Sequence, residues 1–304
     1  MEILYLLEKI RMPGLNEFML LITQLGEETA FLIAALILFW CVDKKSGYYL
    51  MAVGFTGTLA NQFMKLFFRV PRPWVLDSNF TILEQARKAA TGYSFPSGHT
   101  QSAVGTFGLI AYTFKNKWVK FIAITIAILV PLSRMYIGVH TPLDVIVSVA
   151  LAVILIFALK PIVYRDKPYE IAALFAFLTV LAVGFMFFVE YFPFPDDIDA
   201  HNLASGVKNA YTLFGTLVGL LIVYIVDCKW INFSTEAVWY VQLLKAALGF
   251  VVVLTIKSGL KTPLNLLLGE SVGSAVRYFL IVITAGVVWP LTFKLFNKLE
   301  TKVK

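Results

Sequence analysis

The sequence of 304 residues is poor in charge, in cysteine and in histidine. Charged side chains make up 15% of the residues, whereas soluble domains carry about 25%, and 59% of the residues are hydrophobic. A water-soluble fold cannot bury so much apolar surface beneath so little charge, which excludes an ordinary soluble enzyme, a disordered chain and a nucleic-acid-binding domain. The composition therefore predicts an integral membrane protein built from apolar helices.

The two cysteines, Cys41 and Cys228, each lie near the end of an apolar run and show no metal-ligand spacing. We interpret them as free thiols packed among apolar side chains. The sequence also lacks internal repeats, low-complexity tracts and a second soluble domain. These absences leave a bundle of membrane helices with no cofactor as the expected architecture.

Long apolar runs, separated by short polar breaks, predict about nine membrane-spanning helices. Runs of this length favour helices over barrel strands, whose signature is alternation over about ten residues. The expected fold is an all-α polytopic bundle, with residues 2–12 as an amphipathic helix in the membrane interface. Glu27 and Glu28 interrupt the first run, and a helix start or break near Gly26 is the favoured explanation. The expected spans are residues 16–42, 47–68, 99–114, 119–139, 142–163, 170–192, 204–226, 237–256 and 275–295.

The distribution of lysine and arginine predicts how the chain lies in the membrane, because cytoplasmic connections carry an excess of these residues. An odd number of spans places the two termini on opposite sides. The basic connections then put the C-terminus in the cytoplasm and the N-terminus outside, together with the acidic segment 196–199. The basic residues gather in alternate connections, at 44–45, 115–120 and 160–167, and in the tail at 294–304.

Three segments hold polar residues that are costly near a membrane, and all three lie on the predicted outer side. Their cations can converge on one small anion, because arginine forks match phosphate oxygens. Glycine lets the backbone approach a ligand, and the free amides at a helix N-terminus favour an anion. The segments are Lys65 with Arg72-Pro73, the run Pro96-Ser97-Gly98-His99, and Ser133-Arg134 with His140 and Asp144.

His140 is placed to work together with Asp144. Thr141 is predicted to cap a helix that begins at Pro142, and the four-residue step from His140 to Asp144 lets the carboxylate fix the imidazole tautomer. The other ring nitrogen is then more nucleophilic. With His99 as a second imidazole, the pattern predicts phosphoryl transfer without a metal ion. One histidine attacks phosphorus, and the other protonates the leaving oxygen.

The spacing of these motifs resembles that of the type 2 phosphatidic acid phosphatase superfamily. The segments Lys65-x6-Arg72-Pro73, Pro96-Ser97-Gly98-His99 and Ser133-Arg134-x5-His140-x3-Asp144 match its three motifs in order and spacing, over about residues 20–165. The resemblance implies a six-helix membrane core with His140 as nucleophile, His99 as general acid and later base, and Asp144 orienting His140. It also implies that no metal is required, and that the phosphate is bound by Lys65, Arg72, Ser97, Gly98 and Arg134.

The resemblance divides the chain into two parts. Residues 1–165 are expected to form the catalytic core with its interfacial helix, and residues 166–304 to form further spans packed on that core. The nine-span layout and the run Trp74-Val75-Leu76-Asp77 are similar to glucose-6-phosphatase of the same superfamily. That resemblance implies a site on the non-cytoplasmic side.

The expected function is hydrolysis of a terminal phosphate from a lipid phosphate or diphosphate through a phosphohistidine at His140. Phosphatidic acid, phosphatidylglycerol phosphate and polyprenyl diphosphate are the candidate substrates, because a site at the membrane surface admits a head group while the tails stay in the bilayer. Two alternatives stay open, namely a soluble phosphomonoester such as a sugar phosphate, and a transporter or sensor that binds phosphate without catalysis. The expected partners are the phospholipid or isoprenoid phosphate and membrane lipids, with no nucleic acid. The expected location is a bacterial plasma membrane.

Overall fold

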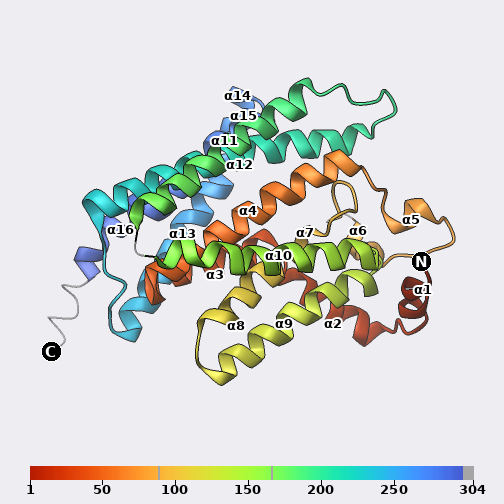
Figure 1. Ribbon diagram of the computed structural model, residues 1–304, viewed down its shortest axis with the longest axis horizontal. Helices are drawn as coiled ribbons and strands as arrows, with labels where there is room; N and C mark the ends of the chain where they lie inside the picture. Colours follow the sequence, from red (N-terminus) through yellow and green to blue (C-terminus); the bar gives the residue numbers. More distant parts are fainter. Residues whose placement is uncertain (88–89, 166, 297–304) are drawn as a thin grey trace. The chain divides into compact units, whose positions relative to one another are not determined.

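The computed structural model describes residues 1–87, 90–165 and 167–296, which form helices and their connections, with no strand among them (Figure 1). Six of these helices are long and apolar enough to cross a membrane, and a seventh span is added if the bent pair Pro13–Gln24 and Glu28–Val42 counts as one. The expected all-α membrane fold is confirmed, and the chain is an integral membrane protein. The expected count of nine spans is not confirmed.

The helices follow one another along the chain with short connections, and four of them continue into π-helical turns. The α-helices are α1 (Glu2–Lys9), α2 (Pro13–Gln24), α3 (Glu28–Ile37), α4 (Lys44–Phe68), α5 (Pro73–Leu76), α6 (Glu84–Arg87), α7 (Gly98–Ala103), α8 (Leu109–Thr113), α9 (Lys117–Tyr136), α10 (Pro142–Tyr164), α11 (Pro168–Tyr191), α12 (Ala200–Val226), α13 (Trp239–Gly259), α14 (Lys261–Leu268), α15 (Glu270–Ile283) and α16 (Trp289–Leu291). The π-helical turns are η1 (Leu38–Val42), η2 (Val104–Gly108), η3 (Asp227–Ile231) and η4 (Thr284–Val288).

Two of the expected spans are helical without meeting the length and hydropathy of a membrane span. Helix α4 has 25 residues, but polar side chains such as Asn61 and Lys65 lie in its second half. Helices α7 and α8 with η2 between them run from Gly98 to Thr113, which falls short of the about 20 residues that a span requires. Both departures fall on helices that carry motif residues.

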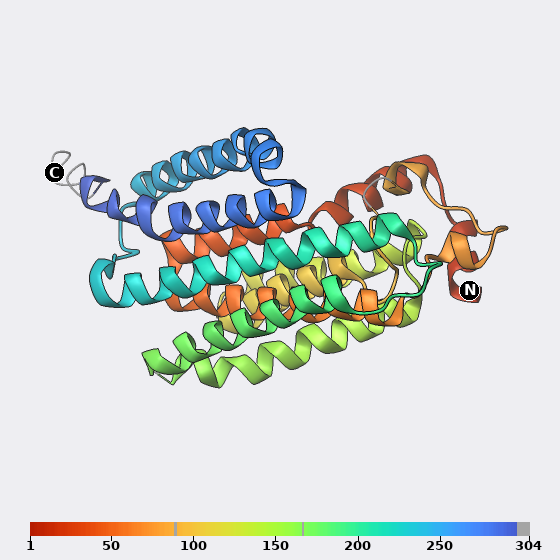
Figure 2. The same cartoon turned by 90° about the horizontal axis from the view of Figure 1, so that it is seen from above.

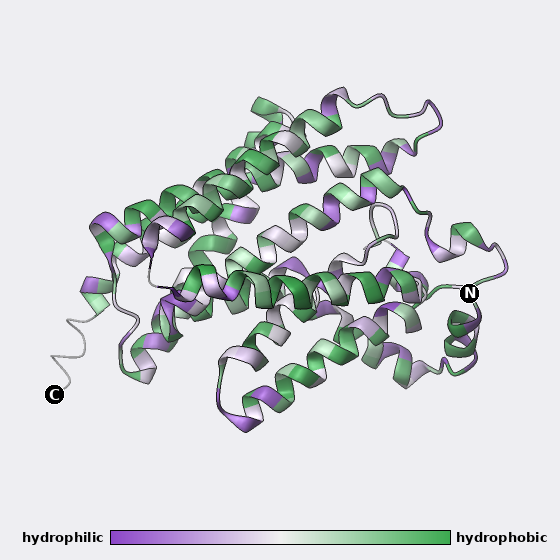
Figure 3. Ribbon diagram, in the orientation of Figure 1, coloured by the Kyte–Doolittle hydropathy of each residue, from purple (hydrophilic) through white to green (hydrophobic). Residues whose placement is uncertain are grey.

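Hydropathy is distributed as expected for helices whose sides meet lipid. Figure 3 shows α10 coloured as hydrophobic along most of its length and hydrophilic residues at the connection between α8 and α9. Large apolar side chains of α10, among them Ile146, Ile154 and Phe157, are exposed. In a water-soluble protein such a contiguous apolar surface would cause association, whereas in a membrane it faces the acyl chains.

By packing, the described chain forms two compact units. Unit 1 comprises residues 1–32, 53–159 and 194–206, and unit 2 comprises residues 33–52, 160–193 and 207 onward. These units are defined by contacts within the structure and not by function. The functional division expected at residue 165 stays a prediction.

In unit 1, α9 packs against α1, α2, α7, η2 and α8. Gly26, in the break between α2 and α3, lies so close to α7 that a Cβ added there would be 2.8 Å from the carbonyl oxygen of His99. Only glycine allows this approach. The break expected near Gly26 is confirmed, and it brings the end of α2 against the helices that carry the motifs.

In unit 2, α13 and α15 run side by side in opposite directions, joined by α14 (Figure 2). The Trp40 indole of η1 donates a hydrogen bond of 2.8 Å to the carbonyl oxygen of Ala285. A polar cluster around the buried Asp227 carboxylate, here named the Asp227 cluster, consists of Lys44, Tyr48, Asp227 and Asn232. In it, the Asp227 carboxylate accepts hydrogen bonds of 3.0 Å from the Lys44 ammonium and from the Tyr48 hydroxyl.

Candidate active site

The residues singled out by the three motifs lie at one end of unit 1, where four helices begin or end. Lys65 is in the last turn of α4, and Arg134 is in the last turn of α9. His99 is in the first turn of α7, and Asp144 is in the first turn of α10. Arg72 and His140 lie in the connections beside them. Six of the eight site residues are buried, namely Lys65, Arg72, Ser97, Arg134, His140 and Asp144.

Two helix caps position the motif residues. The Ser97 hydroxyl accepts a hydrogen bond of 3.3 Å from the backbone amide of Thr100, at the start of α7. At the start of α10, the Asp144 carboxylate accepts the Thr141 amide at 2.7 Å, and the Thr141 hydroxyl accepts the Asp144 amide at 3.3 Å. This reciprocal cap is the one expected from Thr141 and Pro142. It fixes Asp144 relative to the preceding histidine.

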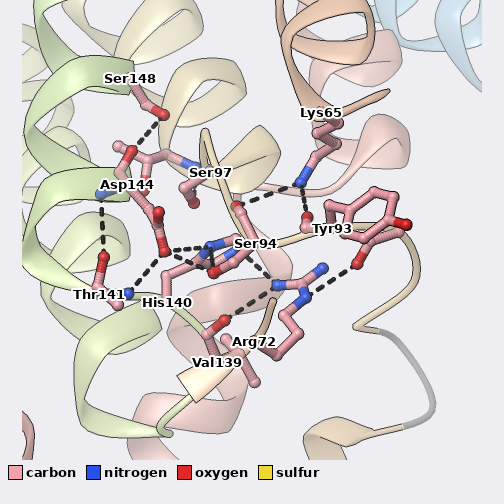
Figure 4. A network of polar contacts seen from close by, with 12 residues as sticks. Lys65, Arg72, Tyr93, Ser94, Ser97, Val139, His140, Thr141, Asp144 and Ser148 are labelled. Atoms are coloured by element: carbon pink, nitrogen blue, oxygen red, sulfur yellow. Dashed lines mark hydrogen bonds and ion pairs between the residues drawn. The ribbon is translucent and has the colours of Figure 1, made fainter. Parts of the chain in front are cut away.

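The His140 ring lies between a carboxylate and a guanidinium (Figure 4). Its Nδ1 atom faces Asp144 Oδ2 at 3.4 Å, and its Nε2 atom is 3.0 Å from Nη1 of Arg72. The Ser94 hydroxyl donates a hydrogen bond of 2.6 Å to Asp144 Oδ2 and lies 3.4 Å from His140 Nδ1. A carboxylate at Nδ1 favours the tautomer that carries its proton there, which leaves Nε2 unprotonated and able to accept the hydrogen bond from Arg72.

Main-chain carbonyl groups hold the Arg72 side chain in place. Its guanidinium donates hydrogen bonds to the carbonyl oxygens of Val139 at 3.0 Å, Gly92 at 3.0 Å and Thr91 at 2.7 Å. The Lys65 ammonium likewise donates to the carbonyl oxygens of Tyr93 and Ser94. Segment 91–94 therefore positions two of the three cations that are expected to bind phosphate.

Burial sets the protonation of the groups in the connections. It lowers the pKa of Arg72 to about 10, so the guanidinium stays charged at neutral pH. Burial, followed by the positive charge of Arg72, holds the pKa of His140 well below its ordinary value. The His140 imidazole is therefore neutral at neutral pH, as an attacking nitrogen must be.

Arg134 and His99 complete the arrangement. Nη1 of Arg134 donates a hydrogen bond of 2.7 Å to the Thr23 hydroxyl, whereas its Nε has no hydrogen-bond partner among the described residues. His99 is half-buried, and the charges of Arg134, Arg72 and Lys65 act on it. It lies within electrostatic range of His140. Lys65, Arg72, Ser97, His140 and Asp144 share one hydrogen-bonded network, and Arg134 and His99 border it.

Sequence reasoning missed Ser94, Thr23 and the carbonyl groups of segment 91–94. A serine in a long polar connection carries no distinguishing signal, and a carbonyl group carries none at all. Thr23 lies far from the motifs along the chain and meets Arg134 only because α2 ends against α9. The nearness of Ser94 to the Ser97-Gly98-His99 run was the one available indication.

The fold and the site together define a membrane protein with a buried histidine, His140, held between a carboxylate and a guanidinium. Residues 45–168 match the family model of the PAP2 superfamily, and residues 211–302 match the model described as PAP2 superfamily phosphatase, transmembrane extension. Phosphatidylglycerophosphatase B of Bacillus subtilis is 33% identical over 165 residues, which are 50% of this chain and 76% of that protein. The chain belongs to the PAP2 superfamily and is a phosphatase.

Two further proteins are similar to this chain in sequence. Undecaprenyl-diphosphatase of Sulfolobus acidocaldarius is 30% identical over 146 residues, which are 48% of this chain and 69% of that protein. A solved structure, the transmembrane PAP2 type phosphatidylglycerolphosphate phosphatase from Bacillus subtilis, is 32% identical and covers 55% of this chain and 85% of its own, with a TM-score of 0.46.

Proposed function

We propose that the protein hydrolyses a terminal phosphate from a membrane lipid through a phosphohistidine at His140. Nε2 of His140 forms a bond to phosphorus while the bond from phosphorus to the lipid oxygen breaks. His99, protonated once the negative charge of the phosphate offsets the burial and the nearby cations that lower its pKa, gives its proton to that oxygen. Water then attacks the phosphorus as His99 takes one of its protons. The bond from phosphorus to Nε2 breaks, and inorganic phosphate and neutral His140 are released.

The observation that carries this proposal is the position of His140 between Asp144 and Arg72. The carboxylate holds the proton on Nδ1, and the guanidinium lies beside Nε2, where it can donate to an oxygen of a phosphate attacked by that nitrogen. Arg72 therefore supports both the neutral state of the nucleophile and the negative charge of the transferred group. A buried histidine that served only structure would not need a cation at its free nitrogen.

Phosphate binding is assigned to the remaining motif residues. Lys65 and Arg72 supply buried cations, and the unpartnered Nε of Arg134 is a donor for an anionic oxygen. Hydrogen bonds to a charged group contribute about 1.5–3 kcal/mol each. Ser97 and Gly98, at the start of α7, are the expected main-chain contacts.

An outward-facing site is supported by the placement of charge along α9. The site lies at the C-terminal end of this helix, and the basic connection with Lys115, Lys117 and Lys120 lies at its N-terminal end. A helix of 20 residues spans about 30 Å, the thickness of the hydrocarbon layer. The positive-inside rule then puts the site on the non-cytoplasmic side, with the N-terminus outside and the C-terminus in the cytoplasm. A bacterial plasma membrane is the proposed location.

The test is phosphate release by the purified full chain in detergent micelles. Phosphatidylglycerol phosphate, phosphatidic acid and undecaprenyl diphosphate are compared with glucose 6-phosphate, and we expect turnover of lipid phosphate that persists in EDTA. His140→Ala should lower kcat/KM by about 10³-fold or more. His201→Ala, a change at an exposed histidine, is the matched control and should keep full activity. Retention of activity within tenfold by His140→Ala contradicts the proposed nucleophile, and faster release from glucose 6-phosphate than from every lipid contradicts the proposed substrate class.

A further inference from the structure

Two buried amide side chains lie between α4 and α7, beside the site but outside its hydrogen-bonded network. Asn61 is one turn before Lys65 on α4, and Gln101 is one turn after Gly98 on α7. Each amide faces a glycine of the opposite helix. A Cβ added to Gly98 would be 3.7 Å from Asn61 Oδ1, and one added to Gly57 would overlap Gln101 Nε2.

These amides lack the partners that buried amides normally have. The exposed fraction of each side chain is 1%. Neither Oδ1 nor Nδ2 of Asn61 has a hydrogen-bond partner among the described residues, and the same is true of Gln101 Nε2 and of the neighbouring Thr100 hydroxyl. An unpaired buried polar group costs about 1–3 kcal/mol. Polar groups at membrane depth that carry such a cost mark substrate or ion sites.

The position of Asn61 relates it to the leaving group of the reaction. Gly98 directly precedes His99, whose proton goes to the oxygen that leaves with the lipid. With His99 as the acid, the leaving oxygen lies at the start of α7, where the Asn61 amide packs against Gly98. The phosphate itself is assigned to Lys65, Arg72 and Arg134.

The chemistry of the amides indicates what that leaving group carries. An amide is neutral and offers both a donor and an acceptor, which matches a hydroxyl group. A second phosphate joined directly to the first, as in a diphosphate, would require further cations next to the ester, and the side chains nearest to Gly98 and Gly57 are the uncharged amides of Asn61 and Gln101. The unpaired amide groups of Asn61 and Gln101 fit an alcohol that carries hydroxyl groups close to the phosphate ester.

We propose that Asn61, supported by Gln101, is a subsite for a hydroxyl group of the leaving alcohol. The protein would then prefer lipids whose phosphate is carried by a polyol, such as phosphatidylglycerol phosphate, over phosphatidic acid and polyprenyl diphosphate. This inference rests on the proposed phosphatase function and on His99 as its acid. It gives Asn61 a role in substrate selection rather than in bond breaking.

The test compares two lipids with the same acyl chains, phosphatidylglycerol phosphate and phosphatidic acid, of which only the first has a free hydroxyl in the leaving group. Asn61→Leu keeps the volume and removes the hydrogen bonds, and Asn61→Ala removes both. Each variant should lower kcat/KM for phosphatidylglycerol phosphate by about 10- to 100-fold and for phosphatidic acid by less than threefold. The control is Thr58→Ala on the same helix, whose hydroxyl is already bonded to the Gly54 carbonyl oxygen at 2.9 Å, and both activities should be retained.

A second measurement uses the unmodified protein. The proposal can then be refuted even if the Asn61 variants fold poorly. Glycerol 3-phosphate and propyl phosphate have the same carbon count and charge, and only the former carries hydroxyl groups. Glycerol 3-phosphate should inhibit more strongly, by about tenfold or more, and this difference should vanish in Asn61→Leu. Equal inhibition by the two compounds, or an equal loss of both lipid activities in the Asn61 variants, overturns the subsite. Absence of any lipid phosphatase activity in the unmodified protein would instead contradict the function on which the subsite rests.

Discussion

Each of the two units buries a charged cluster, and the clusters differ in how their charges are matched. In the Asp227 cluster of unit 2, one carboxylate meets one ammonium at 3.0 Å, and the Lys44 ammonium also lies 4.3 Å from the centre of the Phe233 ring. In the site of unit 1, the three cations Lys65, Arg72 and Arg134 are buried around a single network carboxylate, Asp144. That carboxylate is already engaged by Ser94, Thr141 and His140.

We infer from this difference that the Asp227 cluster serves structure and that the site of unit 1 serves binding. A matched buried pair needs nothing further, because its attraction offsets part of the loss of hydration. An excess of buried cations is unfavourable until an anion arrives, and each then gains a partner in a site that excludes water. Substitutions that remove one charge from either cluster test this distinction.

The largest effect is expected from Asp144→Asn. The amide keeps the size of the carboxylate but no longer fixes the proton on His140 Nδ1, so the Nε2 lone pair is lost for part of the population. We expect kcat/KM to fall by about 10³-fold, with little change in the melting temperature of the purified protein. A loss below tenfold would show that His140 does not depend on this carboxylate.

An intermediate effect is expected from Arg72→Gln, and it should be visible in the pH profile. The Arg72 cation disfavours protonation of His140 and so helps to lower the pKa of that histidine. Removing the cation raises this pKa, and the acid limb of kcat/KM against pH should move to higher pH, with an overall loss of about 100-fold. Arg87→Gln, at an exposed arginine paired with Glu84, should leave the limb in place. An acid limb unmoved in Arg72→Gln would contradict the assignment of that limb to His140.

The smallest effect on activity is expected from Asp227→Asn, which is the same chemical change made in the matched cluster. It leaves the Lys44 ammonium without its counter-charge, and we expect a loss of about 1–3 kcal/mol in unfolding free energy, since Lys44 is partly exposed. Phosphatase activity below the new melting temperature should stay within threefold. The double variant with Lys44→Met should recover stability in thermal unfolding. Failure to recover would show that the pair is not matched in the way described.

Helix positions followed closely from hydropathy, because a long apolar run has few alternatives to a membrane helix. The expected spans 119–139 and 142–163 correspond to α9 and α10. The number of membrane spans was harder to predict where a helix carries polar side chains of the candidate site. Helix α4 is an example, because its polar face carries Asn61 and Lys65. A span that must present a cation to a substrate loses the apolar signal by which spans are recognised.

The membrane class, the family resemblance and the candidate residues of the three motifs were predictable from the sequence, because these depend on composition and on short fixed spacings. The sequence also indicated the break at Gly26 and the cap at Thr141. Tertiary structure alone decided that Ser94 reaches Asp144, that segment 91–94 grips Arg72 and Lys65, and that Asn61 faces Gly98. These contacts join segments from different helices, and no local pattern encodes which uncharged groups will meet when the helices pack.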